Sequence, residues 1–135
     1  IRDGKLLVDG QPYFIWGSYT QDLQEVDWDY LRSSGYNTVL SYTNGNASAF
    51  GSDGADPAQS DFHPIRRFMD GAAAHQMKVM LNLKDMYNAS LTRDMSRFHC
   101  DDQCITNLIT ALVAEFKSHS ALLGYYLSDE IHGNL

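Results

Sequence analysis

The chain alternates short apolar segments of strand length with longer segments that carry apolar residues at helical spacing. Each connection between two successive strands is long enough to hold a helix, so we expect parallel strands joined by right-handed crossovers. Two architectures fit this order: a small open doubly wound sheet, or half of a (β/α)₈ barrel with four strands and three helices. The expected strands span residues 13–19, 37–42, 78–83 and 122–129, and the expected helices span residues 26–35, 62–76 and 102–119.

Local signals support these boundaries. Asp9 and Gly10 lie between two apolar runs and predict the turn of a β-hairpin over residues 5–15, ahead of the alternation. Gly35 suits the positive φ that ends a helix, and Asp61 can cap the second helix, with Pro64 in its first turn. The third helix has core spacing at Ile105, Leu108, Ile109, Leu112, Val113 and Phe116.

The bulk composition limits both size and partners. A length of 135 residues predicts a single domain, residues 1–135, that is large enough to bury a core. A net charge of −7 and the absence of Lys/Arg runs argue against nucleic acid as a partner. No apolar stretch approaches the roughly 20 residues that span a bilayer, so no membrane partner is expected.

Cys100 and Cys104 are the two cysteines of the chain. They fit either free thiols or a small disulfide, because residues four apart in a helical turn lie within bridging range. Zinc held by these thiols and His99 would lack a fourth ligand at a usual spacing, so no metal is predicted. No cofactor is predicted either, since the chain contains neither a glycine-rich dinucleotide turn nor a phosphate loop.

Two sequons, at Asn46 and Asn88, fall in polar, loop-like stretches, as N-glycan acceptors require. Together with the cysteine pair and a first residue, Ile1, that is not an initiator methionine, they favour a secreted, extracellular protein.

Polar side chains gather where the expected strands end. Ligand sites of both candidate architectures lie at the carboxyl ends of the strands. The two long loops, residues 43–61 and 84–101, also leave from these ends, whereas the opposite connections are short. We therefore expect a ligand site on this side of the sheet. Its candidate substrate-binding residues are Tyr19, Tyr42, Asn82, Asp85 and Asp129.

Glu130 is the candidate catalytic residue. It follows the apolar fourth strand, and apolar surroundings favour the protonated carboxyl group that a general acid needs. Two plainer interpretations remain open: Glu130 in a surface salt bridge and Asp129 capping the turn. Lys84 and Asp85 are adjacent and can pair with each other rather than with a ligand.

Three passages resemble the amino-terminal half of a retaining glycoside hydrolase of clan A, a (β/α)₈ family. Residues 4–17 (GKLLVDGQPYFIWG) are similar to the entry into the first barrel strand, and residues 31–39 (LRSSGYNTV) to the entry into the second. Residues 119–130 (HSALLGYYLSDE) resemble the fourth strand. The resemblance implies an oligo- or polysaccharide substrate and makes Glu130 the acid/base. The family usually has Asn, which bonds the sugar 2-hydroxyl, where this chain has Asp129.

The family's nucleophile is a Glu that ends the seventh strand, beyond the four strands of this chain. Retaining hydrolysis needs two carboxyl groups roughly 5–5.5 Å apart, and Asp85 is the one local substitute. A half barrel would also leave two strand edges open. We therefore expect the missing half of the barrel, or a second copy of the chain, as partner. The alternatives are a non-catalytic carbohydrate-binding barrel and a stand-alone open α/β domain.

Overall fold

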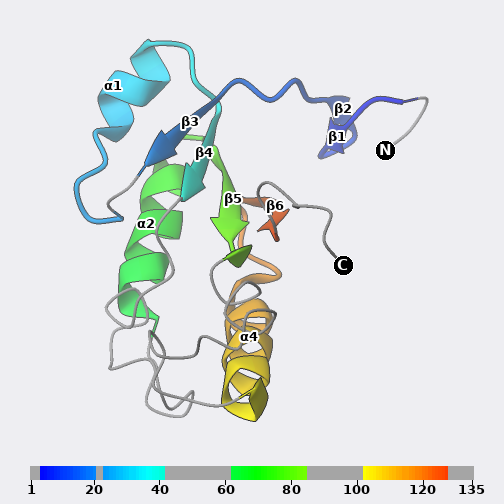
Figure 1. Ribbon diagram of the computed structural model, residues 1–135. Helices are drawn as coiled ribbons and strands as arrows, with labels where there is room; N and C mark the ends of the chain where they lie inside the picture. Colours follow the sequence, from blue (N-terminus) through cyan, green and yellow to red (C-terminus); the bar gives the residue numbers. More distant parts are fainter. Residues whose placement is uncertain (1–3, 21–22, 42–61, 85–101, 128–135) are drawn as a thin grey trace, which may run out of the picture.

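The computed structural model describes residues 4–20, 23–41, 62–84 and 102–127 (Figure 1). They form an α/β fold around a four-stranded parallel sheet, which confirms the predicted parallel strand and helix units. The strands are β3 (Gly17–Thr20), β4 (Thr38–Ser41), β5 (Lys78–Asn82) and β6 (Leu122–Tyr126). The helices are α1 (Trp28–Ser33), α2 (His63–Ala74) and α4 (Asp102–Phe116). None of the helices in these ranges is long and apolar enough to span a membrane.

The strands lie side by side in the order in which they occur in the chain, β3-β4-β5-β6. Every neighbouring pair is parallel, with Tyr19 opposite Leu40 and Leu40 opposite Met80. The register shifts between Val79 and Met80, and this irregularity places Gly124 opposite Met80. A helix stands in each connection, as parallel strands require.

The three helices pack on one face of the sheet, because a single apolar core joins them to alternate strand residues. Val39, Val79 and Leu81 are fully buried in this core. The stripe predicted for α4 is confirmed by the burial of Ile105, Leu108, Leu112 and Phe116, with Ile109 and Val113 partly buried against it. From α2 the core receives Ile65, Phe68, Met69 and Ala72.

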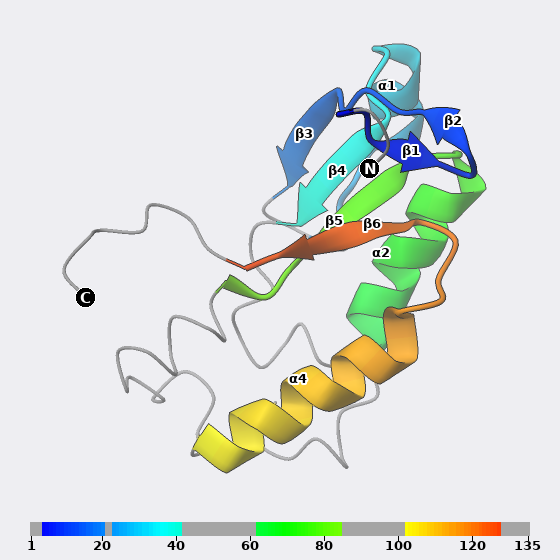
Figure 2. The ribbon, with the colours of Figure 1, turned by 90° about the vertical axis from the view of Figure 1, so that its right-hand side faces the viewer.

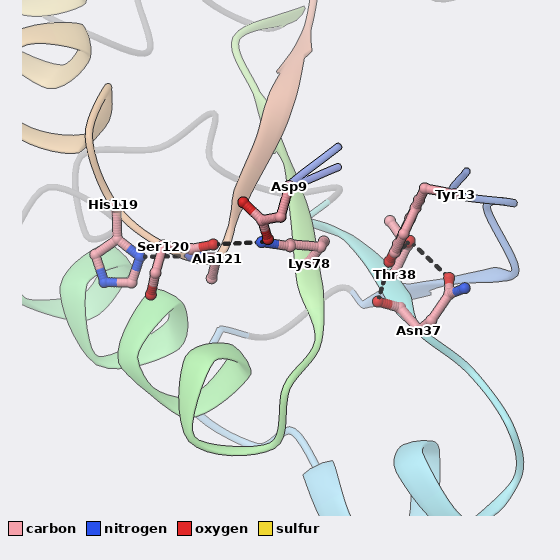
Figure 3. Close-up of polar contacts among 8 residues, drawn as sticks. All are labelled: Asp9, Tyr13, Asn37, Thr38, Lys78, His119, Ser120 and Ala121. Carbon is pink, nitrogen blue, oxygen red and sulfur yellow. Dashed lines mark hydrogen bonds and ion pairs between the residues drawn. The ribbon is translucent and has the colours of Figure 1, made fainter. Parts of the chain in front are cut away.

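The predicted hairpin is confirmed. Strand β1 (Leu7–Val8) pairs antiparallel with β2 (Gln11–Pro12). Asp9 and Gly10 join them with φ values of 52° and 79°, the two positive φ angles of a primed hairpin turn. The hairpin lies near the amino ends of the sheet strands (Figure 2). Lys78 links these parts, with its Nζ 4.0 Å from Asp9 and donating to the carbonyl oxygen of Ser120 at 2.7 Å (Figure 3).

Several helices and strands begin or end at other residues than predicted. Helix α1 begins at Trp28, capped by Asp27, whose carboxylate accepts from the backbone N–H of Tyr30 at 2.9 Å. The first residue of the predicted pattern, Val26, therefore precedes the helix. The first strand starts at Gly17 rather than at residue 13, and α4 ends at Phe116 rather than at residue 119.

The start of α2 also differs. Its N-cap is Phe62, in a left-handed conformation with φ of 53° and no side-chain capping bond. Phe62 is 5% exposed, and its ring lies edge-on to Phe116 at 6.2 Å, so core packing fixes this end of the helix. The expected cap, Asp61, lies outside the described residues, whereas Pro64 stands in the first turn as predicted.

His119 joins α2 to the turn before β6. Its Nε2 lies 3.1 Å from a carboxylate oxygen of Asp70, and its Nδ1 accepts from the backbone N–H of Ala121 at 3.2 Å (Figure 3). With Nδ1 accepting, the neutral ring carries its proton on Nε2 and donates it to Asp70. The histidine therefore holds the amino end of β6 in place.

Candidate functional site

The face of the sheet opposite the helices bears a hollow of about 330 Å³. Because side chains alternate along a strand, the residues on this face are those between the core positions. Leu40 and Met80 form its floor, with Thr38 beside them. Ile15, Gly17 and Ser18 line it from the first strand and the segment before it. The lining of the hollow is thus mostly apolar, and either a ligand or further side chains could fill it.

Two tyrosines stand at opposite sides of this hollow. Tyr19 comes from the edge strand β3, and Tyr126 comes from the other edge strand, β6. Tyr19 is 70% exposed, which is unusual for an aromatic residue in a parallel sheet. Aromatic rings with a phenol at the tip offer both an apolar face and a hydrogen-bonding group. The structure thus places the predicted residue Tyr19 with Tyr126 around one concave surface.

Trp16 is also exposed, at 57%, and stacks on Tyr36 with ring centroids 6.4 Å apart. It precedes β3 at the same sheet edge as Phe14, which is 77% exposed. Aromatic residues of such a sheet more commonly lie in the core, but these two rings lie outside it. Apolar side chains are therefore exposed beside β3, which within the described residues pairs with a strand on one side only.

Asn82, predicted to bind substrate, is buried at the carboxyl end of β5, with 1% of its surface exposed. Its backbone N–H donates to the Ser41 hydroxyl at 3.2 Å, and its Oδ1 accepts from the backbone N–H of Lys84 at 2.7 Å. The side-chain oxygen therefore shapes the turn that leaves the strand. Asn82 therefore fixes the path of the backbone from Asn82 to Lys84, at the edge where ligands are expected.

Lys84 is the main residue that sequence reasoning missed. It was expected at the start of a polar loop, but it is only 8% exposed. A lysine is almost never buried to this extent unless its charge is paired. Lys84 stands two residues beyond the end of β5, where the alternation of side chains along the strand no longer applies, so no local pattern indicates its burial.

Tyr125 lies on the helix side of β6, next to Tyr126. Burial raises the pKa of its phenol above the ordinary value of 10.0. The hydroxyl oxygen is buried and has no hydrogen-bond partner among the described residues. Of the two adjacent tyrosines, Tyr126 is the one that lines the hollow.

Several predicted site residues lie outside the described residues, and their roles stay predictions. They are Tyr42, Asp85, Asp129 and Glu130 for the site, and Asn46 and Asn88 for glycosylation. Cys104 is disulfide-bonded, and its pairing with Cys100 stays a prediction because Cys100 lies outside the described residues. Within the described ranges, no group of three His, Cys, Asp or Glu side chains is placed to hold a metal ion.

The chain was compared with known proteins at three levels. No family model matches it, and no curated protein or solved structure matches it either.

Proposed function

We propose that this chain is the first half of a (β/α)₈ barrel of a retaining glycoside hydrolase that acts on oligo- or polysaccharides, with Glu130 as acid/base. The observation that carries the proposal is the hollow on the uncovered sheet face, with Tyr19 and Tyr126 at its two sides. In a barrel this face is the interior, and its carboxyl edge holds the active site. Glu130 follows β6 by four residues in the sequence, so under this proposal it is expected at that edge.

The sheet supports the barrel over a doubly wound sheet. In a doubly wound fold the strand order reverses and helices cover both faces. Within the described ranges, the strand order follows the chain and helices α1, α2 and α4 pack on one face. This is the arrangement of successive barrel units.

The edges of the sheet support a closing partner. Within the described residues β3 pairs only with β4, and β6 pairs only with β5. Parallel sheets are normally covered on both faces, and open edges favour further strand pairing. We propose that four further strands, from the other half of the barrel or from a second copy, close the structure and bring the nucleophilic carboxylate. Analytical ultracentrifugation of the 135-residue chain separates these cases, since a self-closing half barrel sediments as a dimer.

The hydrolytic proposal is tested by Glu130→Gln in the full-length protein, with aryl β-glycosides as substrates. Removal of a general acid/base costs about 10²–10⁴-fold in rate. Glu115→Gln is the matched control, because Glu115 lies on α4, pairs with Arg66 and is remote from the hollow. If Glu130→Gln leaves turnover unchanged, the assignment of the acid/base is wrong.

A second candidate function is carbohydrate binding without hydrolysis. The high exposure of Tyr19 beside the hollow favours it, since exposed aromatic rings can stack on sugars. We expect Tyr19→Ala and Tyr126→Ala to weaken binding of β-linked oligosaccharides about tenfold in calorimetric titrations. Tyr30→Ala is the control, because Tyr30 is 64% exposed but lies on α1, away from the hollow. Binding with no product release in the same samples would favour this function over hydrolysis.

A further inference from the structure

His119 makes two hydrogen bonds that require opposite roles of its two ring nitrogens. Its Nδ1 accepts from the backbone N–H of Ala121 at 3.2 Å (Figure 3). Its Nε2 lies 3.1 Å from a carboxylate oxygen of Asp70 on α2. A carboxylate can only accept, so Nε2 carries the proton and Nδ1 has none. Both bonds are therefore present together in the neutral ring, in one of its two tautomers.

Protonation of His119 would remove one of these bonds and keep the other. The charged ring donates from both nitrogens, so Nδ1 can no longer accept from Ala121. The bond from Nε2 to Asp70 becomes an ion pair, which keeps the ring on α2. Ala121 is 1% exposed, so its N–H does not reach water unless the chain moves. Histidine is the side chain whose charge ordinarily changes between about pH 5 and about pH 8, so this loss belongs to mild acid.

The other charged groups of the elements packed around His119 have partners of their own. They are Arg66, which pairs with Glu115, and Lys78, which pairs with Asp9 and the carbonyl oxygen of Ser120. The neighbouring ring on α4 is that of Phe116, with centroids 6.4 Å apart, and Lys117 in the turn after α4 is exposed. Among the described residues, Asp70 is therefore the acid that pairs with the ring.

Ala121 stands beside an irregular point of the sheet. Its carbonyl oxygen accepts from the backbone N–H of Val79 at 2.7 Å. Directly after this point the register shifts, because Val79 pairs with Leu122 whereas Met80 pairs with Gly124. Strand β6 thus has one residue more than β5 here, and the ladder of backbone bonds is locally disrupted. The amino end of β6 therefore depends on the bond to His119 more than a regular strand end would.

We propose that His119 is a pH-sensitive switch that holds the amino end of β6 at neutral pH and releases it in acid. The released part is the turn from His119 to Ala121, while the Asp70 carboxylate retains the ring. Strand β6 leads to Tyr126 at one side of the hollow, so acid loosens the strand that positions this ring. The switch does not depend on what the hollow binds.

His75 offers an internal comparison, because its nitrogens have different partners. Its Nδ1 lies 2.8 Å from the carbonyl oxygen of Gly71, and its Nε2 lies 3.4 Å from a carboxylate oxygen of Asp29. Both partners are acceptors, so protonation of His75 breaks neither contact. The described residues thus include one histidine whose protonation removes a hydrogen bond and one whose protonation does not.

The switch is tested by hydrogen exchange of the backbone amides in the 135-residue chain, followed by NMR from about pH 7.5 to about pH 5. Protection of the Ala121 amide is taken relative to the intrinsic exchange rate at each pH. We expect it to fall about tenfold or more in acid, because local opening exposes this amide. Protection at Leu81, in the core strand β5, should change much less. Unchanged protection at Ala121, or an equal fall at both amides, would overturn the switch.

His119→Asn separates the hydrogen bond from the titration. The Oδ1 of asparagine can accept in place of Nδ1 and does not titrate, so protection of Ala121 should stay constant over the same pH range. His75→Asn is the matched control and should leave the pH response of Ala121 as in the wild type. A response that survives His119→Asn, or that is lost in His75→Asn, contradicts the proposal.

If His119→Asn does not fold, the ring of the wild type is measured instead. The ¹⁵N chemical shifts of His119 at about pH 7.5 should show a proton on Nε2 and none on Nδ1. A proton on Nδ1 at this pH would overturn the proposal, because the ring could not then accept from Ala121.

Discussion

The side-chain amide of Asn37 donates a hydrogen bond of 2.7 Å to the carbonyl oxygen of Phe14. Its Oδ1 accepts from the backbone N–H of Trp16 at 2.9 Å, and the carbonyl oxygen of Trp16 accepts from the backbone N–H of Asn37 at 3.0 Å. The Asn37 side chain thus bonds the backbone of the segment before β3 as a neighbouring strand would. This contact holds the first strand in register with β4, and with it Tyr19 at the side of the hollow.

We therefore predict that Asn37→Ala destabilises the fold by about 1–2 kcal/mol in urea unfolding, because its three side-chain hydrogen bonds, to Phe14, Trp16 and Thr38, are lost. Asn37→Asp keeps the acceptor for Trp16 but sets a carboxylate oxygen against the carbonyl oxygen of Phe14, so it should also destabilise the fold. Asn107→Ala is the control, since Asn107 is exposed on α4, where its Oδ1 accepts from the side-chain amide of Gln103 at 3.0 Å. Equal effects at positions 37 and 107 would contradict the role of Asn37.

Tyr13 reinforces the same junction from the hairpin side (Figure 3). Its hydroxyl donates to the carbonyl oxygen of Asn37 at 2.8 Å and lies 3.0 Å from the Thr38 hydroxyl. Burial raises the pKa of Tyr13 above 10.0, although the bond with Thr38 and the charge of Arg32 act in the opposite direction. The folded state therefore holds this proton more tightly than the unfolded chain does.

The sign of the resulting pH dependence follows from linkage. The stabilisation by Tyr13 is fully present below the unfolded pKa of about 10 and is lost as the pH rises through the folded value. Tyr13→Phe should lower stability at pH 7 by about 1 kcal/mol and make the loss of stability above pH 10 shallower. Urea unfolding at pH 7 and over pH 9–11 measures both effects. An alkaline limb as steep in Tyr13→Phe as in the wild type would show that another group causes it.

Gly71 is required by its contact with Trp28. A Cβ atom at this position would lie 2.5 Å from Nε1 of Trp28, whose ring packs against Phe68 at 5.2 Å and His75 at 6.2 Å. Glycine to alanine within a helix normally stabilises by about 1 kcal/mol. Here we predict that Gly71→Ala destabilises by about 1–3 kcal/mol, because the indole is forced out of its packing.

As a control, Gly71→Ala is also introduced into the Trp28→Ala variant. With the indole removed, Gly71→Ala should regain its ordinary helix-stabilising effect, so the two substitutions are coupled. Thermal unfolding of the four proteins gives the coupling. A Gly71→Ala that is stabilising in the wild type would show that Trp28 adjusts at little cost.

The strand and helix order was predictable because it depends on local periodicity, which a sequence displays directly. The turn at Asp9-Gly10 and the apolar stripe of α4 belong to this class. The start of α2 at Phe62 was not predictable from capping rules, because packing of its ring on Phe116 overrides them. The burial of Lys84 was missed for a similar reason, since it depends on how β5 and β6 end relative to each other.

The exposure of Tyr19 could not be predicted from the sequence either. Aromatic residues in a parallel strand are usually covered on both faces, and nothing in the local pattern shows which face helices will take. Only the strand order and the single helix layer reveal that Tyr19 and Tyr126 line an uncovered hollow.

The adjacent Tyr125 gives a prediction of the opposite kind, a substitution that stabilises. Its hydroxyl oxygen is buried on the helix side of β6 without a hydrogen-bond partner among the described residues. A buried polar group of this kind costs about 1–3 kcal/mol, so Tyr125→Phe should raise the free energy of unfolding by about 1 kcal/mol. Tyr30→Phe, on α1 where the ring is 64% exposed, is the matched control and should change stability little. A loss of stability in Tyr125→Phe would show that the hydroxyl bonds to a group outside the described residues.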